Sequence, residues 1–495
     1  MENEVVEEKV SQQYEAVVYR NTDVENYQFK QLTVGDESKS NSTFMYFSAI
    51  TANLLIFSCT SGLGWTSPVI PTLSSHNPKV NPLGRPVTPL EISWIASLLV
   101  LGAAFGPLVI AKLGDLLGRK KALICISIPH ILSIITLAYA SDVRVFYVTR
   151  FVSGFVMGSA FGLVPVYLAE IAEMRNRGTV GALMSIFITI GILYSFVIGP
   201  LVSVKTLTLC CVAPGIVFLV VFSLVIPESP VYLASKGDTQ GASHVLMKLR
   251  GRTADQVQHE LRLILKALEE EKQEMSSGGV TELFTDAGLR KSLVICLGLF
   301  MFQQFSGLNV LTAFLEQIFA ASGSSMSKYV STNVVMLTQF FSSILATAIV
   351  ERFPKRSLLM LSTTGTFLSL WFLALYFYLK TNTTYNIDFL FWLPIASMIS
   401  FFIMLGGLAA LPWGLVSEIF PTKFRATAGC LASFACFFSS FLVTLGFPLV
   451  LQIFGMSHCF WFFSGCMLMC TVFVYCLVPE TAGKTSAEIQ EILRK

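Results

Sequence analysis

Neutral amide side chains stand inside a long apolar segment of this chain. Gln303, Gln304 and Asn309 occur in the stretch QQFSGLN, which has hydrophobic residues on both sides. An amide carries both hydrogen-bond donors and acceptors, and burying it costs less than burying a charge. Such a cluster either binds a polar, uncharged ligand or joins neighbouring helices. Two adjacent Gln residues with an Asn shortly after them favour ligand binding.

A second set of polar residues is duplicated along the chain. Glu170 precedes Arg177 by seven residues in YLAEIAEMRNRG, and Glu418 precedes Arg425 by seven in LVSEIFPTKFRA. Two further pairs of motifs, GDLLGRKK with VERFPKRS and IPESP with VPETAGK, repeat in the same order. The offsets between partners are 236, 248 and 252 residues, so the chain consists of two similar halves. This organisation is typical of secondary transporters.

The duplicated charges could form a cytoplasmic latch, in which opposite charges of the two halves pair when that side is shut. An exposed ion pair contributes only ~0–1 kcal/mol, which suits a contact that must open again. The alternative is that these charges only set the topology of the chain. We expect the latch to comprise Asp115, Arg119, Glu170, Arg177, Glu228, Glu351, Arg352, Glu418, Arg425 and Glu480.

The composition predicts a protein that lies within a membrane. Hydrophobic residues make up 54% of the 495 residues and charged residues 13%, and the mean hydropathy is +0.67. A soluble chain of this length needs more charge to cover its surface. Apolar stretches that can span ~30 Å of hydrocarbon as helices occur at 45–69, 91–112, 121–140, 145–168, 178–202, 206–226, 290–318, 328–350, 357–379, 388–415, 426–448 and 457–478.

These twelve stretches predict an all-α membrane protein with two pseudo-symmetric six-helix bundles. The predicted divisions are a cytoplasmic tail, a first bundle, a cytoplasmic helical linker, a second bundle and a second tail, at 1–44, 45–226, 227–289, 290–478 and 479–495. Most of the 34 basic residues then fall in the tails and inward loops, as the positive-inside rule requires. The net charge of +3 therefore reflects loop placement, and we expect no nucleic-acid partner.

Other sequence features point away from catalysis. The eleven Cys residues are scattered through apolar spans without metal-ligand spacing, and the five His residues lie far from any paired nucleophile. We therefore expect no enzymatic activity, no metal site and no cofactor. Asn382 opens the sequon Asn382-Thr383-Thr384 in a predicted outward loop and is a candidate glycosylation site.

The motifs GDLLGRKK, RFVSGFVMG, PVYLAE, PESP, QQFSGLN, VERFPKR, PWGLVSEIFP and PETAGKT together resemble the sugar porter family of the major facilitator superfamily. The resemblance covers nearly the whole chain after residue 45. The first span, GLGWTSPVIP, is similar in pattern to insect trehalose and glucose facilitators. The resemblance implies the major facilitator fold and a sugar substrate bound midway through the bundle.

The resemblance also implies residue roles. It places Gln303, Gln304, Asn309, Gln339 and Trp413 at positions that contact sugar, with Ser185 where the family has Gln. An indole offers a flat apolar face to a sugar ring together with one N–H donor. Phe314 stands at a gate position that is usually Tyr, although ordinary packing is the alternative. Pro412, which precedes the tryptophan, is the second candidate gate residue.

Several positions depart from the family pattern. Ala409-Ala410 replaces a Gly-Pro pair on span ten, and Leu405 and Cys436 stand where acidic and polar residues are usual. Because Gly-Pro pairs let a helix bend, we expect span ten to be stiffer here. The pocket also loses hydrogen-bond partners, each worth ~0.5–1.5 kcal/mol. A sugar other than glucose, weak transport, or sugar binding without transport is compatible with these departures.

The resemblance also bears on energy coupling, because proton-coupled sugar porters carry an Asp on the first span and SGLGWTSP has no acidic residue. Intramembrane carboxylates are costly and are usually functional, so we expect passive, facilitative transport of a sugar such as trehalose or a hexose. The alternatives are a proton-coupled symporter and a non-transporting sensor. We expect a monomer in the lipid bilayer of the plasma membrane, or of an intracellular vesicle, with both termini cytoplasmic.

Overall fold

Helices make up all the regular structure in the part of the chain that the structure describes. The computed structural model describes residues 42–275, 282–323, 327–350, 352–383, 388–484 and 486–494. The predicted N-terminal tail, apart from its last three residues, and the predicted latch residue Glu351 lie outside these ranges.

The first half contains six membrane-spanning segments, the first of which comprises two consecutive helices. These segments are α2 (Thr43–Gly64) with α3 (Thr66–Leu73), α4 (Pro89–Leu117), α5 (Arg119–Ala138), α6 (Val143–Ile171), α7 (Arg177–Ile198) and α8 (Val204–Leu224). Short 3-10 turns, η1 (Met174–Asn176) and η2 (Gly199–Leu201), flank α7. Four helices of the linker follow, namely α9 (Pro230–Ser235), α10 (Thr239–Arg250), α11 (Ala254–Met275) and α12 (Glu282–Thr285).

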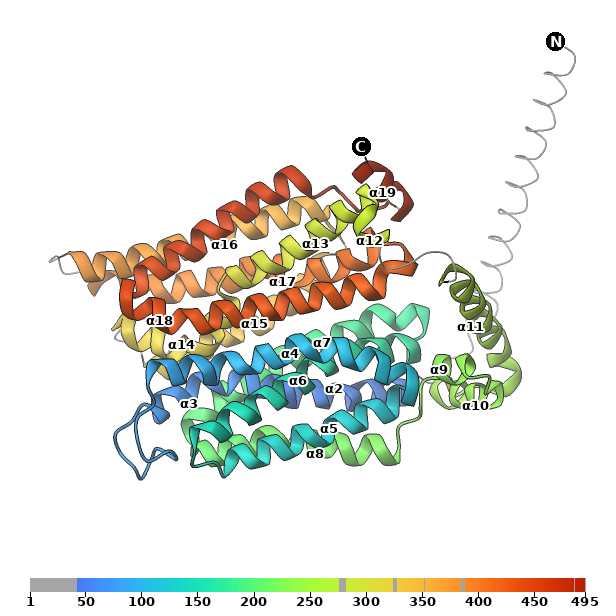
Figure 1. Ribbon diagram of the computed structural model, residues 1–495, viewed down its shortest axis with the longest axis horizontal. Coiled ribbons are helices and arrows are strands. Elements are labelled where there is room, and N and C mark those ends of the chain that lie inside the picture. Colours follow the sequence, from blue (N-terminus) through green and yellow to red (C-terminus); the bar gives the residue numbers. More distant parts are fainter. Residues whose placement is uncertain are drawn as a thin grey trace, which may run out of the picture.

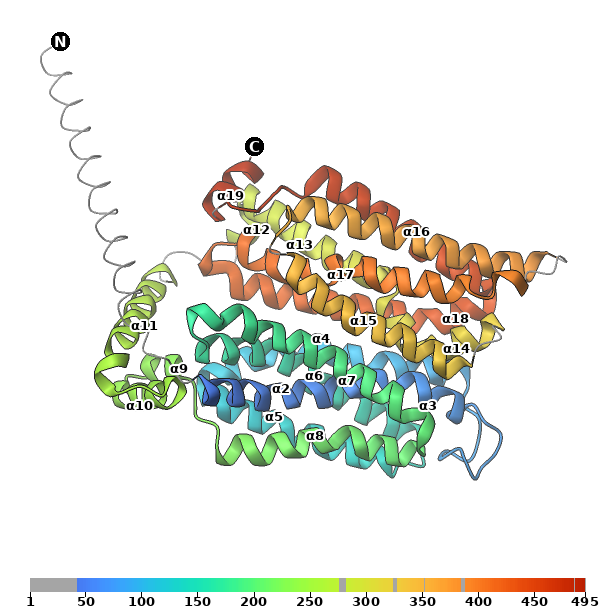
Figure 2. The same ribbon diagram turned by 180° about the vertical axis from the view of Figure 1, so that it is seen from behind.

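The second half repeats this plan. Its helices are α13 (Ala287–Phe305) with α14 (Leu308–Ser322), α15 (Lys328–Val350), α16 (Lys355–Asn382), α17 (Leu393–Ile419) and α18 (Thr422–Leu477), with the 3-10 turn η3 (Asp388–Leu390) before α17. The C-terminal helix α19 (Ser486–Arg494) ends the described chain. Figure 1 shows α2–α8 in one bundle and α13–α18 in the other, and Figure 2 shows the same division from behind.

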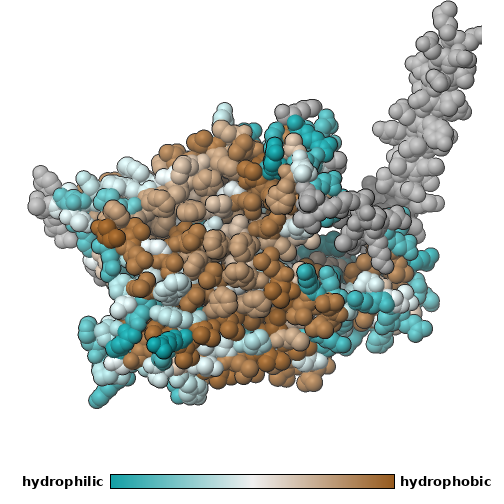
Figure 3. Space-filling view, viewed as in Figure 1, coloured by the Kyte–Doolittle hydropathy of each residue, from teal (hydrophilic) through white to brown (hydrophobic). Residues whose placement is uncertain are grey.

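The surface matches a membrane environment. Figure 3 shows hydrophobic side chains over the middle of the molecule and hydrophilic ones at its two ends. Eleven described helical segments are long and apolar enough to cross a membrane, and one of them, Lys423–Leu477, has 55 residues. Because a span needs about 20 residues, that segment accounts for two spans. The prediction of an all-α membrane protein with twelve spans is confirmed.

The join between the last two spans differs from the predicted loop. α18 runs from Thr422 to Leu477 with a single break at Gly455, where φ is +80° and ψ 172°. A left-handed φ of this kind favours glycine, because a Cβ would crowd the backbone there. One glycine therefore turns the chain where the sequence predicted a linker at 449–456.

One other break interrupts span seven. α13 ends at Phe305, and Gly307, with φ +82°, precedes α14. A discontinuous helix brings irregular backbone to the middle of a bundle, where it can border a ligand site. Gln303, Gln304 and Asn309 lie on either side of this break. Span one is continuous, because Trp65 between α2 and α3 keeps helical backbone angles and its N–H donates to the Ser61 carbonyl.

Four glycines bring α4 and α6 into close contact. Gly102 and Gly106 on α4 face Gly154 and Gly158 on α6, and a Cβ on any of them would collide with backbone of the other helix. This small-xxx-small spacing on both helices allows the close backbone approach that drives packing in membranes. The pair forms part of the core of the first bundle.

Candidate functional site

A cavity lies between the two bundles. Its volume is about 240 Å³. The first bundle contributes side chains from α2, α4, α6 and α7, and the second from α13, α14, α15, α17 and α18. All six residues predicted to bind the substrate line it, namely Ser185, Gln303, Gln304, Asn309, Gln339 and Trp413. The structure therefore brings together positions that are up to 228 residues apart in sequence.

The three amides of the QQFSGLN stretch are joined to one another, and Gln303 and Gln304 are buried while Asn309 is half-buried. Gln303 and Gln304 are 4% and 5% exposed. Asn309 Nδ2 donates to Gln304 Oε1 at 2.7 Å, and Gln304 Nε2 donates to Gln303 Oε1 at 3.4 Å. Gln303 Nε2 donates to the carbonyl of Ala409 on α17 at 3.1 Å. These hydrogen bonds fix the orientation of each amide, as buried polar groups require.

Trp413 forms an aromatic wall of the cavity. Its ring meets that of Phe300 edge to face, with centroids 4.7 Å apart, and 42% of the residue remains exposed. An aromatic side chain supported on one edge and open on its face can stack against a sugar ring. The indole follows Pro412, which lies within α17 and is buried.

The two candidate gate residues do not border the cavity. Phe314 is buried on α14, and its ring lies 5.2 Å from that of Phe447 on α18. Pro412 is enclosed in α17, beside the cavity-lining pair Ala410 and Trp413. α17 is continuous through Ala409-Ala410, as the loss of the Gly-Pro pair predicts.

The side of the molecule bearing α3 and α14 is closed by contact between the bundles. The Glu316 N–H donates to Ser67 Oγ at 3.1 Å across this junction. Glu316 is buried but does not line the cavity. Glu91, the other acidic residue near a helix end, pairs with Arg85 and completes a capping box with Thr88 at the start of α4.

A buried arginine binds the first span next to Trp65. Arg150 on α6 is 2% exposed and donates to the carbonyls of Gly62 and Ile95 at 2.6 and 3.0 Å. It also donates to Thr66 Oγ1 at 2.7 Å. Carbonyl and hydroxyl oxygens thus satisfy the guanidinium within the described residues.

The latch motif of the first half is paired within that half. Arg119 contacts Glu170 and Asp115, each at 3.0 Å. Glu228 accepts from the Lys120 N–H at 2.9 Å, which ties the start of the linker to α5.

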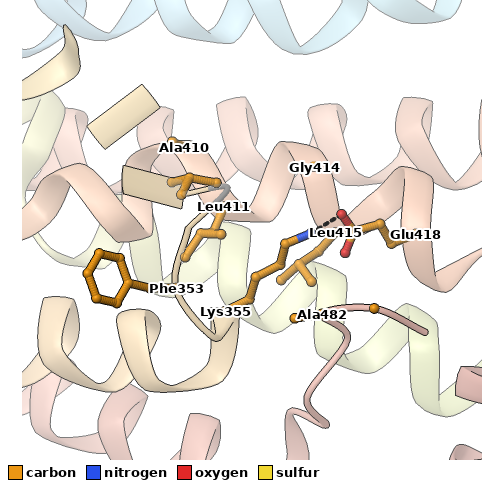
Figure 4. A pocket seen from close by; sticks show the side chains of 10 residues that line it. Phe353, Lys355, Ala410, Leu411, Gly414, Leu415, Glu418 and Ala482 are labelled. Atoms are coloured by element: carbon orange, nitrogen blue, oxygen red, sulfur yellow. Dashed lines mark hydrogen bonds and ion pairs between the residues drawn. The ribbon is translucent and has the colours of Figure 1, made fainter. Parts of the chain in front are cut away.

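The second half repeats the arrangement. Lys355 pairs with Glu418, and Glu480 accepts from the backbone N–H groups of Lys355 and Arg356. Figure 4 shows the Lys355 side chain reaching Glu418 beside a cavity of about 390 Å³ between α17 and the α15–α16 turn. Among the residues that the structure describes, Arg177, Arg352 and Arg425 form no ion pair, and no pair of these motifs joins the two halves.

The cavity also contains hydroxyl side chains that were not predicted. They are Thr60 and Thr189 in the first bundle and Thr312, Ser342, Ser343 and Thr347 in the second. Several of them bond to their own helix four residues back, as Thr60 does to Ile56 and Thr347 to Ser343. Because Ser and Thr do this in any apolar helix, the sequence gives no signal that these residues face a cavity.

Comparison with known proteins identifies the family. A family model described as "Sugar (and other) transporter" matches residues 14–493. The facilitated trehalose transporter of Culex quinquefasciatus is 32% identical over 432 residues, covering 86% of this chain and 81% of that protein. Its counterpart in Polypedilum vanderplanki is 33% identical over 405 residues, covering 82% and 80%.

A solved structure shares the fold. The proton:xylose symporter XylE bound to 6-bromo-6-deoxy-D-glucose superimposes with a TM-score of 0.71 at 21% identity, covering 92% of this chain and all of that one. At that identity the likeness concerns the fold alone. The matches to the family model and to the insect relatives show family membership as well as fold, because they extend over most of the sequence. This chain therefore belongs to the sugar (and other) transporter family.

Proposed function

We propose that this protein carries a sugar across a membrane by facilitated diffusion, with the two bundles exposing the central cavity to each side in turn. The observation that carries the proposal is the cavity itself, which is lined by uncharged hydrogen-bonding groups from both bundles and by Trp413. Amides and hydroxyls match sugar hydroxyls without the desolvation cost of a charge. Relatives described as facilitated trehalose transporters support the same function.

Two sugars are candidate substrates. Trehalose is one, because the relatives are described as facilitated trehalose transporters. A hexose is the other, because the amides, hydroxyls and indole that line the cavity suit any sugar ring.

The lining of the cavity supports passive transport. None of the described residues around it is acidic, and the buried Arg150 is satisfied by oxygens of the protein. A proton-coupled carrier needs a carboxylate that gains and loses its proton during the cycle. We therefore favour uniport over symport, and transport over catalysis.

The proposed orientation places both termini in the cytoplasm of a plasma-membrane protein that acts as a monomer. The linker helices α9–α11 and the C-terminal helix α19 lie at the same end of the molecule (Figure 1), which is the end that the positive-inside rule assigns to the cytoplasm. Asn382 is exposed at the end of α16, on the opposite side, and remains a proposed glycosylation site.

Uptake into proteoliposomes tests the function. We expect labelled glucose to enter until its internal concentration equals the external one, with the same initial rate with and without an inward proton gradient. Labelled trehalose should equilibrate in the same way if it is the substrate. Accumulation above the external level would contradict uniport. Saturable sugar binding without any uptake would favour the non-transporting sensor.

A further inference from the structure

The thiol of Cys436 is part of the hydrogen-bonded chain of amides. Cys436 lies on α18, lines the central cavity and is 2% exposed. Gln304 Nε2 donates to its Sγ at 3.1 Å, and the Sγ lies 3.7 Å from Gln303 Oε1, to which it donates. A thiol is a weak donor and a weak acceptor, and here it serves as both.

The chain extends further on the same helix. Asn309 Nδ2 donates to Ser440 Oγ at 2.6 Å as well as to Gln304 Oε1. Ser440 is 1% exposed and stands four residues after Cys436. α18 therefore holds the amides of α13 and α14 at two points one helical turn apart, and α17 holds them at a third, the Ala409 carbonyl.

Counting donors and acceptors shows what remains for a ligand. Both N–H groups of Gln304 are used, one by Gln303 Oε1 and one by the thiol. Both N–H groups of Asn309 are used as well. Within the described residues, one N–H of Gln303, one lone pair of Gln304 Oε1 and the Oδ1 of Asn309 are left. This wall thus offers mainly acceptors to the cavity.

We propose that Cys436 is a positioning and specificity-determining residue, whose thiol directs the Gln303–Gln304 pair so that this wall selects sugar hydroxyls that donate a hydrogen bond. The inference rests on the proposed sugar transport. Without the thiol, one Gln304 N–H loses its acceptor and Gln303 Oε1 loses a donor, so the amides can turn. The wall then becomes less ordered and gains a donor.

Variants of Cys436 test the positioning role in proteoliposome uptake. We expect Cys436→Ala to raise the KM for glucose by roughly two- to tenfold, the loss that one or two hydrogen bonds produce, with maximal rate little changed. Cys436→Ser keeps a donor and an acceptor and should restore most of the affinity. Cys436→Val fills the space of the sulfur, with one additional methyl group, but makes no hydrogen bonds. If it resembles alanine, the lost hydrogen bonds and not the lost packing are the cause. Cys470→Ala, at a buried α18 position outside the cavity, is the control.

Substrate analogues test the specificity role. A fluorine in place of a hydroxyl cannot donate, and a deoxy position can neither donate nor accept. The modified position is a glucose hydroxyl that faces this wall. For the wild type, we expect the deoxy and the fluoro sugar to bind more weakly than glucose by the same factor. In Cys436→Ala and Cys436→Val, the freed N–H should make the fluoro sugar bind more tightly than the deoxy sugar. A purely structural effect would weaken both analogues alike.

The outcomes separate the two proposals. If Cys436→Ala and Cys436→Val both take up sugar with the KM of the wild type, the proposed role of the thiol is wrong. The proposal of sugar transport is unaffected by that result. A fluoro-to-deoxy affinity ratio that is the same in wild type and variants overturns it as well. Absence of any sugar uptake or binding by the wild type overturns the proposed function, and the assignment of Cys436 with it.

Discussion

Gln304 is the amide whose contacts reach furthest across the cavity wall, since it bonds to Gln303, Asn309 and Cys436. Gln304→Ala removes all three contacts and one acceptor that faces the cavity. We expect the affinity for sugar to fall roughly two- to twelvefold, at ~0.5–1.5 kcal/mol for the one hydrogen bond lost to the ligand. Equilibrium binding of labelled sugar to the purified protein measures this loss.

The matched control is Gln452→Ala, the same substitution at a glutamine that is exposed on α18 and does not line the cavity. Its binding constant should equal that of the wild type. A Gln304→Ala variant that is well expressed and binds sugar as tightly as this control would show that the cavity is not the binding site.

Residue by residue, the sequence could identify the amides and the indole because such groups are rare in apolar spans and occur in a recognisable motif. It could not identify Thr312 or Ser342, whose hydroxyls look like those of any membrane helix until the neighbouring bundle is in place. The thiol of Cys436 was visible only as a departure from the family pattern. Its role depends on a 3.1 Å contact with a residue 132 positions away.

Among the elements, the contact between α4 and α6 is the tightest in the first bundle. A Cβ at Gly158 would lie 2.7 Å from the Ala103 Cα, too close for the helices to keep their spacing. We expect Gly158→Ala to destabilise the protein by ~1–3 kcal/mol, the usual cost of overpacking. Thermal unfolding in detergent measures the change. Gly465→Ala, whose Cβ would meet nothing within 4 Å, should unfold at the wild-type temperature or above.

The C-terminal helix α19 is attached to the second bundle by a polar contact that depends on pH. The Leu289 N–H and then Arg494 lower the pKa of Asp286 below its ordinary value of 3.8, and Arg494 Nη2 lies 3.0 Å from the carboxylate. A depressed pKa stabilises the folded state above the unfolded value, and this contribution is lost as pH falls through the folded pKa.

Asp286→Asn keeps a capping side chain but removes the charge. We therefore expect a constant difference in unfolding temperature between wild type and variant above about pH 5, which shrinks as the pH falls below 3.8. Thermal unfolding across this range provides the comparison. A difference that stays the same at every pH would mean that the carboxylate charge contributes nothing.

At the level of elements, the spans were predictable because an apolar stretch of about 20 residues has few other structures open to it. The starts of α4 and α16 lie only two residues from the predicted ones. The place of the last join was predictable, because Gly455 falls between the predicted spans 426–448 and 457–478. Its form was not, since Ile453, Phe454 and Met456 continue the apolar pattern and a single φ value turns the chain. The break in span seven likewise depends on the left-handed φ of one residue, Gly307.

For the whole molecule, we propose that the charged motifs change partners during transport. In this structure Glu170 and Glu418 pair with Arg119 and Lys355 of their own halves. We propose that Arg177 and Arg425, which form no ion pair within the described residues, reach the opposite half when the cytoplasmic side is shut. Water-exposed pairs of ~0–1 kcal/mol shift such an equilibrium without locking it.

A charge swap decides whether the latch acts across the halves. Arg425→Glu places like charges at the proposed contact with Glu170, so the state shut on the cytoplasmic side should become rarer and sugar uptake should fall by up to about fivefold. Adding Glu170→Arg restores opposite charges there, and uptake should recover beyond the sum of the two single changes. Arg119→Ala serves as the control, because it removes only the partner within the first half. If the effects of the two substitutions on uptake are strictly additive, Arg425 and Glu170 do not contact each other at any stage of transport. In that case these charges only set the topology of the chain.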